Sequence, residues 1–297
     1  MRFPRLSFAT PRKLPRASEL EGRVVVLDIA FAAEGTGTSF EKVTKKLIEG
    51  LGPRLAMWVD HHDHALHADY RKDPRFVLAT KAEHGACPEM IDEALVARAG
   101  VVDTIVCHGD FDGLASAAKW IRGGVEPYAG ADADARAIDT RMGAPSPRAE
   151  VIDRALRARM HDDALKGLVV RYFASGGQDA TLFRELETIA ESVRVMEDNA
   201  RVLAKRYELR GDTALCDVRG NTLTYDKTIL LLLGQERARL ALVHDDTTIT
   251  LAARFDSGLD LLKLVEIQGG MPTRVSVPAS RLDDVVARLV KAGLAAR

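Results

Sequence analysis

Three short apolar runs in the first half of the chain each end beside aspartate or histidine residues. Residues 23–29, 55–59 and 101–106 are rich in valine, isoleucine and leucine, which is typical of strands buried on both faces of a sheet. A stretch with helical spacing, 39–51, separates the first two runs, and an alanine-rich stretch follows the third. Strands that alternate with helices predict a parallel sheet, whose strand carboxyl ends share the edge where α/β proteins bind ligands.

The third run leads into His108-Gly109-Asp110-Phe111-Asp112-Gly113. An imidazole and two carboxylates that point the same way are a ligand set for a cation. An isolated D-x-D-G sequence is also common in solvated acidic turns. A binding site is favoured here because the second run leads straight into Asp60-His61-His62 and the first contains Asp28 near its end.

The predicted strand ends carry hard metal ligands of one chemical kind and no cysteine. The candidates are Asp28, His61, His108, Asp110, Asp112 and Asp139, the last at the end of a short strand predicted near residue 139. Such donors suit manganese or magnesium better than structural zinc. They suffice for two cations about 3.5–4 Å apart, the arrangement that clamps the attacking and leaving oxygens in phosphoryl transfer. For Asp139, an ordinary Asp-Thr turn is an equal alternative.

These motifs resemble those of the DHH phosphoesterase superfamily, which includes RecJ-type exonucleases, oligoribonucleases, family II pyrophosphatases and cyclic-dinucleotide phosphodiesterases. Asp60-His61-His62 resembles the triplet that names the superfamily, and residues 108–113 resemble its first motif. In the superfamily the first motif precedes the triplet, whereas here it follows. The chain therefore resembles a circular permutation within the first domain, which is tolerated when the original termini lie close together.

The resemblance implies a role for each motif residue. The catalytic set would be Asp60, His61, His62, Asp110 and Asp112. One cation would lie among Asp28, His108 and Asp110, and the other among Asp28, His61, Asp112 and Asp139. Asp60 would fix the tautomer of a triplet histidine, and His62 would face the substrate phosphate. Hydroxide would attack the phosphorus beside two Mn²⁺ ions, for which Mg²⁺ or Co²⁺ could substitute.

The last third of the chain resembles the DHH-associated substrate domain. The motifs are residues 254–261 and the tail 268–274, which lacks the histidine of the Gly-Gly-Gly-His sequence usual there. Guanidinium groups and glycine amides suit phosphate oxygens. We therefore expect substrate contacts from His62, His84, Arg254, Gly269, Gly270 and Arg274. For Arg254, an ordinary surface charge is an equal alternative.

The pattern along the chain predicts an α/β protein in three segments. Residues 1–180 would form the parallel-sheet DHH domain with flanking helices and the metal site. Residues 181–209, which lack proline and glycine, would form a long connecting helix, and 210–297 a smaller α+β substrate-binding domain. Residues 1–16 hold five basic residues and three prolines and predict a loosely ordered arm or a basic strap for a polyanion.

Composition excludes several classes of protein. A net charge of −1 argues against a global attraction to nucleic acid or lipid. The three cysteines are far apart and odd in number, which favours a reducing compartment over a disulfide framework. No apolar run reaches the roughly 18 residues that a membrane span needs. We therefore expect a cytoplasmic protein with no membrane partner.

The leading hypothesis is a manganese-dependent phosphodiesterase that acts from the end of short oligonucleotides. Two alternatives stay open. One is a phosphomonoesterase or pyrophosphatase for pAp, pyrophosphate or polyphosphate, and the other is a nucleotide- or RNA-binding module with a vestigial site. The sequence does not choose among RNA, DNA and cyclic dinucleotides, since the contacts to a 2′-hydroxyl cannot be read from it. It also leaves the oligomeric state open, with a homodimer among the options.

Overall fold

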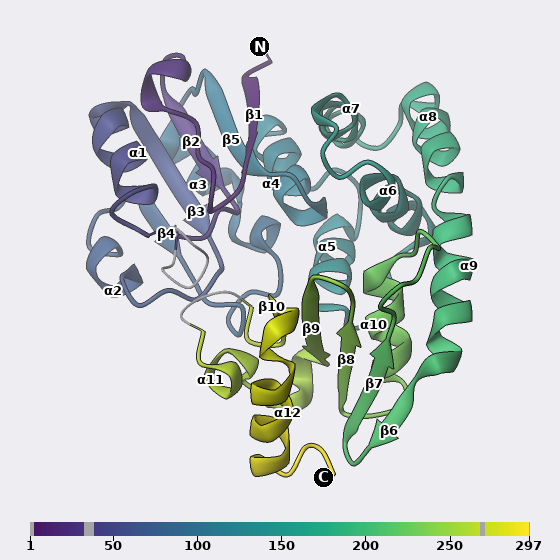
Figure 1. Cartoon of the computed structure of the whole chain (residues 1–297). Coiled ribbons are helices and arrows are strands. Elements are labelled where there is room, and N and C mark those ends of the chain that lie inside the picture. Colours follow the sequence, from purple (N-terminus) through teal and green to yellow (C-terminus); the bar gives the residue numbers. More distant parts are fainter. Residues whose placement is uncertain (1–2, 33–38, 268–270, 297) are drawn as a thin grey trace. The chain divides into compact units, whose positions relative to one another are not determined.

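The computed structural model describes residues 3–32, 39–267 and 271–296. They form two compact units, Met1–Glu191 and Ser192–Arg297, each with its own five-stranded sheet (Figure 1). The first sheet is parallel and the second is mixed, so the predicted combination of an α/β domain with a smaller α+β domain is confirmed. The division after residue 191 falls inside the segment 181–209 that was expected to connect the domains.

The sheet of the first unit has the strand order β1-β5-β2-β3-β4. Its strands are β1 (Arg5–Ala9), β2 (Val24–Leu27), β3 (Leu55–Asp60), β4 (Phe76–Leu78) and β5 (Thr104–His108). All neighbouring strands run parallel, as the alternation of strands and helices predicts. Their carboxyl ends therefore share one edge of the sheet.

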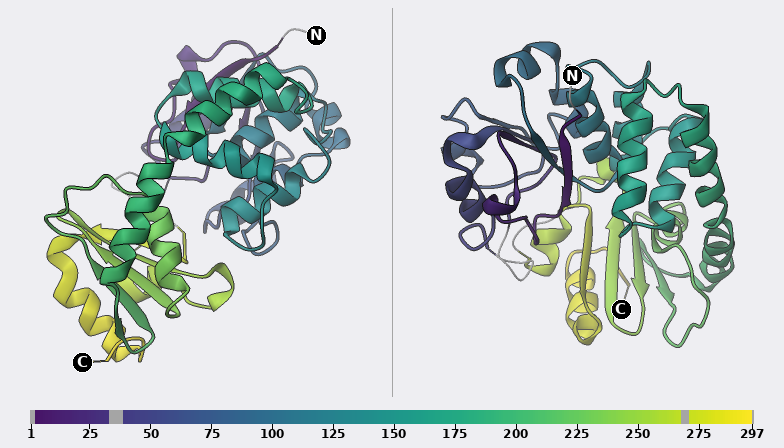
Figure 2. Two further views of the ribbon diagram at one scale, coloured as in Figure 1. Left: turned by 90° about the vertical axis from the view of Figure 1, so that its right-hand side faces the viewer. Right: turned by 90° about the horizontal axis from the view of Figure 1, so that it is seen from above.

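Helices cover both faces of this sheet (Figure 2). The helices are α1 (Thr44–Leu51), α2 (His67–Tyr70), α3 (Glu93–Ala99), α4 (Phe111–Ile121), α5 (Ala131–Thr140), α6 (Pro147–Ala158), α7 (Asp163–Ala174) and α8 (Ala180–Glu191). Alternate residues of one strand point to opposite faces, so Val25 and Leu27 join the core under α3 to α8, while Val24 and Val26 join the core under α1. This burial on both faces explains why the strand sequences are continuously apolar.

Short 3₁₀ turns complete the first unit at Ala17–Glu19, Gly52–Arg54 and Cys87–Met90. Helix α4 is the most deeply placed helix, since every residue except its last is buried. Its small side chains permit this position: Ala115, Ala117 and Ala118 all lie in the core. The helix follows β5 directly, and its first turn therefore lies at the carboxyl edge of the sheet.

The expected loose N-terminal arm is partly wrong. Residues Arg5–Ala9 form the edge strand β1, which pairs in parallel with β5. Leu6 and Phe8 project from one side of the strand and pack against the main core. Two apolar side chains at this spacing are enough to order a short edge strand, although the basic residues and prolines around them are typical of a mobile arm.

The strand expected to end at Asp139 is also wrong, because the segment is helix α5. The buried residues Ala131, Ala135 and Ile138 recur at helical spacing, and alanine is the strongest helix former. The acidic residues between them resemble a loop only in composition, since Asp134 is itself buried and accepts hydrogen bonds from the hydroxyl groups of Tyr128 and Ser146. Asp139 lies in the last turn of this helix.

The connecting segment 181–209 is not one helix. Helix α8 ends at Glu191, α9 (Arg194–Leu203) begins after a two-residue turn, and a 3₁₀ turn (Ala204–Arg206) leads into strand β6 (Glu208–Arg210). Ser192 and Val193, at the break, are both weaker helix formers than alanine or leucine.

The sheet of the second unit has the order β10-β9-β8-β7-β6 (Figure 1). The remaining strands are β7 (Thr213–Asp217), β8 (Leu240–His244), β9 (Thr248–Ala253) and β10 (Arg274–Pro278), and only β7 and β8 pair in parallel. Helices α9 and α10 (Lys227–Gln235) pack on one face, and α11 (Leu261–Val265) and α12 (Leu282–Lys291) pack on the other. Short 3₁₀ turns lie at Phe255–Ser257 and Ala279–Arg281. Within the described ranges, no helix is both long and apolar enough to cross a membrane.

Candidate metal centre

Strand register brings the three motif segments to one level of the first sheet. Leu27 of β2 pairs with Cys107 of β5 on one side and with Val59 of β3 on the other. The next residue on each strand is therefore Asp28, His108 or Asp60. The backbone N–H of Asp28 donates to the Val59 carbonyl oxygen at 2.8 Å, which ties the first of these positions to the strand that carries the triplet.

Asp28 lies at the centre of the cluster and is 1% exposed. Its backbone has φ of 58°, in the left-handed region that aspartate enters more readily than most residues. Neither of its carboxylate oxygens makes a hydrogen bond within the described part of the chain. Burial, reinforced by the charges of Asp112 and Asp110, raises the pKa of Asp28 well above its ordinary value. A nearby cation would relieve both causes.

His61 joins Asp28 to Asp112. Its Nε2 atom lies 3.2 Å from Asp28 Oδ1 and 3.3 Å from Asp112 Oδ2, and the ring is fully buried. Its Nδ1 atom lies 2.9 Å from the backbone carbonyl oxygen of His84. Burial opposes a charge on this ring, but contacts with Asp112 and Asp28 outweigh it and raise the pKa of His61 to about 11. The two carboxylates therefore attract positive charge to this position.

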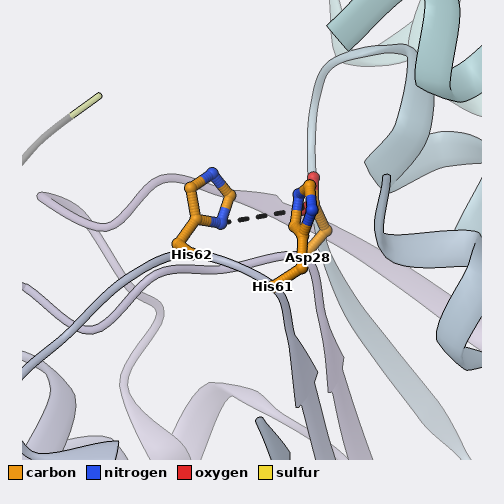
Figure 3. Close-up of side chains that lie close together, drawn as sticks. All are labelled: Asp28, His61 and His62. Atoms are coloured by element: carbon orange, nitrogen blue, oxygen red, sulfur yellow. Dashed lines mark ion pairs between the residues drawn. The ribbon is translucent and has the colours of Figure 1, made fainter. Parts of the chain in front are cut away.

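His62 also points toward Asp28 (Figure 3). Its Nδ1 atom lies 3.9 Å from Asp28 Oδ1 and 2.8 Å from Asp60 Oδ1. Asp60 is fully buried. Burial raises the pKa of its carboxyl, but the contact with His62 outweighs burial and lowers the pKa below its ordinary value, so that the carboxylate stays charged. The triplet residue held by Asp60 is thus His62, while a backbone carbonyl holds His61.

The end of β5 and the start of α4 contribute His108, Asp110 and Asp112. His108 Nδ1 lies 2.6 Å from Asp110 Oδ2 and 3.7 Å from Asp28 Oδ2. Asp110 is the N-cap residue of α4, and Asp112 lies in the first turn, where the helix dipole favours negative charge. Burial opposes a charge on the His108 ring, but Asp110 outweighs it and raises the pKa of His108 to about 10.

Asp139 reaches the cluster from α5 and forms an ion pair with Lys81. Lys81 follows β4 and is 6% exposed. Burial opposes its charge, but Asp139 and Asp112 outweigh burial and raise the pKa of Lys81 above its ordinary value. The sequence interpretation missed Lys81, because one lysine in a polar loop carries no pattern that marks it as buried.

These side chains form three overlapping groups whose ligand atoms lie within 4.8 Å of one another. The groups are Asp28, His61 and His62; Asp28, His108 and Asp110; and His61, Asp112 and Asp139. The second is the set expected for the first cation, and the third contains three of the four residues expected for the other. Both oxygens of Asp28 and Nε2 of His61 are buried and have no hydrogen-bond partner among the described residues, and such oxygen and imidazole ligands fit a hard divalent cation.

The residues expected to contact substrate differ in their exposure and in their distance from the cluster. The His84 side chain is 40% exposed and its Nδ1 lies 3.5 Å from Glu89 Oε2, so the residue meets the centre only through its backbone oxygen. In the second unit, exposed Arg254 pairs with Asp256 at 2.9 Å, and Arg274 Nη1 donates to Thr228 Oγ1 at 3.3 Å. Gly269 and Gly270 lie outside the described residues.

No protein-family model and no curated protein matches the sequence. Among solved structures, the pGpG-specific phosphodiesterase PggH from Vibrio cholerae is 12% identical, with a TM-score of 0.44 over 92% of this chain and 100% of that one. The exonuclease RecJ bound to manganese is 14% identical, with a TM-score of 0.49 over 95% of this chain and 78% of that one. An uncharacterized protein from Helicobacter pylori G27 is 12% identical, with a TM-score of 0.27 over 91% of this chain and 83% of that one.

Proposed function

We propose that this chain is a divalent-metal-dependent phosphoesterase of the DHH type that hydrolyses phosphodiester bonds in short oligonucleotides or small nucleotides. One observation carries the proposal: Asp28 lies buried among His61, His108 and Asp112 with both carboxylate oxygens lacking hydrogen bonds within the described residues. A buried carboxylate beside further carboxylates is costly unless positive charge lies among them. The ligand set contains no thiolate, as expected for cations that bind phosphate oxygens.

The residues divide into two overlapping ligand sets. Asp28, His108 and Asp110 would hold one cation, and His61, Asp112 and Asp139 the other, with Asp28 close to both. We propose Mn²⁺ in both positions, with Mg²⁺ or Co²⁺ as substitutes. When bound, such cations lower the pKa of water and neutralise charge on the phosphate.

Asp60 and His62 act on the substrate side of this centre. Asp60 accepts a hydrogen bond from Nδ1 of His62 and so turns Nε2 of that ring away from the buried carboxylate. The His62 side chain is 27% exposed, which leaves it open to a phosphate oxygen of the substrate. The contact orients the phosphate for attack, and Asp60 acts only through His62 as a positioning residue.

The second unit supplies the remaining substrate contacts in this proposal. Arg254 and Arg274 would bind phosphate or sugar oxygens of the substrate, together with Gly269 and Gly270, and His84 would contribute from the first unit. For His84, Arg254 and Arg274, the assignment predicts a higher KM with little change in kcat when the side chain is truncated to alanine, because these residues would bind substrate away from the reacting phosphorus.

A substrate panel with Mn²⁺ tests the proposal. Labelled RNA and DNA dinucleotides, a cyclic dinucleotide, pAp and pyrophosphate are each incubated with the protein, and the products are identified. Release of mononucleotides from a dinucleotide is the expected result. Asp110→Ala should lose most of this activity, and Asp198→Ala, whose side chain is 71% exposed on α9, should keep it.

Three outcomes would contradict the proposal. Equal rates for Asp110→Ala and the parent would remove the metal centre from the reaction. Phosphate release from pAp or pyrophosphate alone would support the phosphomonoesterase or pyrophosphatase alternative. Tight oligonucleotide binding without turnover in Mn²⁺, Mg²⁺ or Co²⁺ would support a vestigial binding module.

A further inference from the structure

Lys81 places a fixed positive charge at the edge of the acidic cluster. The lysine is 6% exposed, and its ion-pair partner Asp139 has a side chain that is 13% exposed. The same ammonium group interacts electrostatically with Asp112 and Asp28. A buried ammonium is costly to keep unless carboxylates surround it, so these contacts hold it in place.

The ammonium lies where a divalent cation would compete with it. Asp139 is one of the three residues in the group His61, Asp112 and Asp139, and it is also the residue that Lys81 contacts. A carboxylate that pairs with an ammonium binds a divalent cation more weakly, because the two positive charges repel each other. The group Asp28, His108 and Asp110 does not include the partner of Lys81.

We propose that Lys81 is a built-in competitor for the second cation and makes the two cation sites unequal in affinity. The cation at Asp28, His108 and Asp110 binds first and tightly. The cation at His61, Asp112 and Asp139 binds only when Lys81 releases Asp139, so occupancy of the second site depends on the cation concentration. This inference rests on the proposed function and adds a metal-dependent control to it.

The experiment is a titration of the protein with Mn²⁺ alone. Calorimetry measures the binding steps, and electron paramagnetic resonance measures the concentration of free Mn²⁺. The parent should bind one ion tightly and a second ion with a dissociation constant about tenfold or more higher, since the ammonium opposes the second ion. Lys81→Met keeps the length of the apolar stem and removes the charge, so its second step should tighten by about tenfold or more. A second step in Lys81→Met that is unchanged or weaker would overturn the proposal.

Lys119 offers a matched control. It is also 6% exposed and ion-paired, but its partner Asp132 belongs to none of the three ligand groups. Lys119→Met should leave both binding steps as in the parent. Tightening of the second step in Lys119→Met as well would overturn the proposal, because it would show a general effect of losing a buried charge.

A second variant and the activity of the parent protein allow failure of this inference to be distinguished from failure of the proposed function. If Lys81→Met does not fold, Lys81→Gln replaces it, because the amide can still donate to Asp139 without a charge, and the same tightening is expected. Two unequal steps in a parent protein that hydrolyses nothing would overturn the proposed function alone. Two steps that Lys81→Met and Lys81→Gln leave unchanged would overturn this inference alone, and a parent that binds no Mn²⁺ would overturn both.

Discussion

His61 Nδ1 lies 2.9 Å from the backbone carbonyl oxygen of His84, and this contact determines how the ring meets the acidic cluster. The carbonyl can only accept, so Nδ1 keeps its proton and Nε2 faces Asp28 and Asp112. Because the acceptor is a backbone oxygen, residue 84 orients the His61 ring whatever its own side chain is. The loop that follows β4 is therefore part of the metal centre through its main chain.

The first prediction separates the two histidines. His61→Ala should weaken Mn²⁺ binding by about 100-fold or more, because it removes a donor and the residue that spans two carboxylates. His84→Ala should leave Mn²⁺ affinity within about twofold, since the backbone oxygen stays in place. Calorimetric titration of both variants checks the contrast. A comparable loss in His84→Ala would show that the exposed imidazole, not the carbonyl, supports the centre.

The second prediction concerns Gly113, where the first turn of α4 passes close to the centre. A Cβ atom there would lie 2.6 Å from the His108 carbonyl oxygen and 3.0 Å from Asp28 Oδ2. Gly113→Ala should therefore displace Asp28 or the helix terminus, lower Mn²⁺ affinity, and cost about 1–3 kcal/mol of unfolding free energy. Metal titration and urea unfolding measure the two effects.

Gly167 of α7 is the control for this substitution. A Cβ atom at Gly167 would meet only Arg171 Nη1, at an ordinary contact distance of 3.5 Å. Gly167→Ala should leave Mn²⁺ affinity unchanged and stabilise the helix by up to about 1 kcal/mol. Parent-like metal binding in Gly113→Ala would show that the turn can move without disturbing Asp28.

The third prediction tests whether Asp60 acts through His62. Asp60→Asn keeps the shape of the buried side chain but loses the charge opposite Nδ1 of His62. We expect kcat to fall by about 10–100-fold with little change in Mn²⁺ affinity. The double variant Asp60→Asn with His62→Gln should be no slower than His62→Gln alone. Additive losses in this cycle would show that Asp60 acts independently of His62.

The fourth prediction concerns the pH dependence of stability in the second unit. Asp245 accepts hydrogen bonds from the backbone of Thr247 and Thr248 at 2.9 and 2.7 Å, and it pairs with Lys227 at 2.5 Å. Burial raises the pKa of Asp245, but Lys227 and the two amides outweigh it and hold the pKa below its ordinary value of 3.8. A depressed pKa stabilises the folded state above the ordinary value, and this contribution disappears as the pH falls through the folded-state pKa.

Asp245→Asn should therefore cost about 1–3 kcal/mol at pH 7 and progressively less as the pH is lowered below about 4. Urea unfolding of parent and variant at several pH values gives the difference. Asp198→Asn, at an exposed position of α9, should show a small difference at every pH. A cost for Asp245→Asn that stays constant down to pH 3 would contradict the linkage.

The central strands of the first unit could be predicted from the sequence, because burial on both faces makes a parallel strand apolar throughout. Residues 23–29, 55–59 and 101–106 contain β2, all but the last residue of β3 and the start of β5, and their parallel pairing brings Asp28, Asp60 and His108 to one edge. Each of these positions follows from strand length and direction alone. No knowledge of side-chain packing was needed.

The contributions of α5 and of the loop after β4 could not be read in the same way. Asp139 was assigned to a strand end, but it reaches the cluster because α5 packs against α4 and α6, which is a tertiary contact. Buried Lys81 pairs with Asp139 and interacts electrostatically with Asp112, and neither carboxylate is near it in sequence. Edge strand β1 was missed for a related reason, since its order comes from Leu6 and Phe8 packing on a core formed by later segments.

Strand β5 is the last of the five strands of its sheet to be synthesised, yet it lies between β1 and β2. A nascent chain that stops before Thr104 leaves β1 without its neighbour and exposes one edge of β2, the kind of edge that invites misassociation. Emergence of Thr104–His108 from the ribosome fills the gap and delivers His108, with Asp110 two residues behind it. Co-translational folding of the first unit and its ability to capture a cation should therefore begin together.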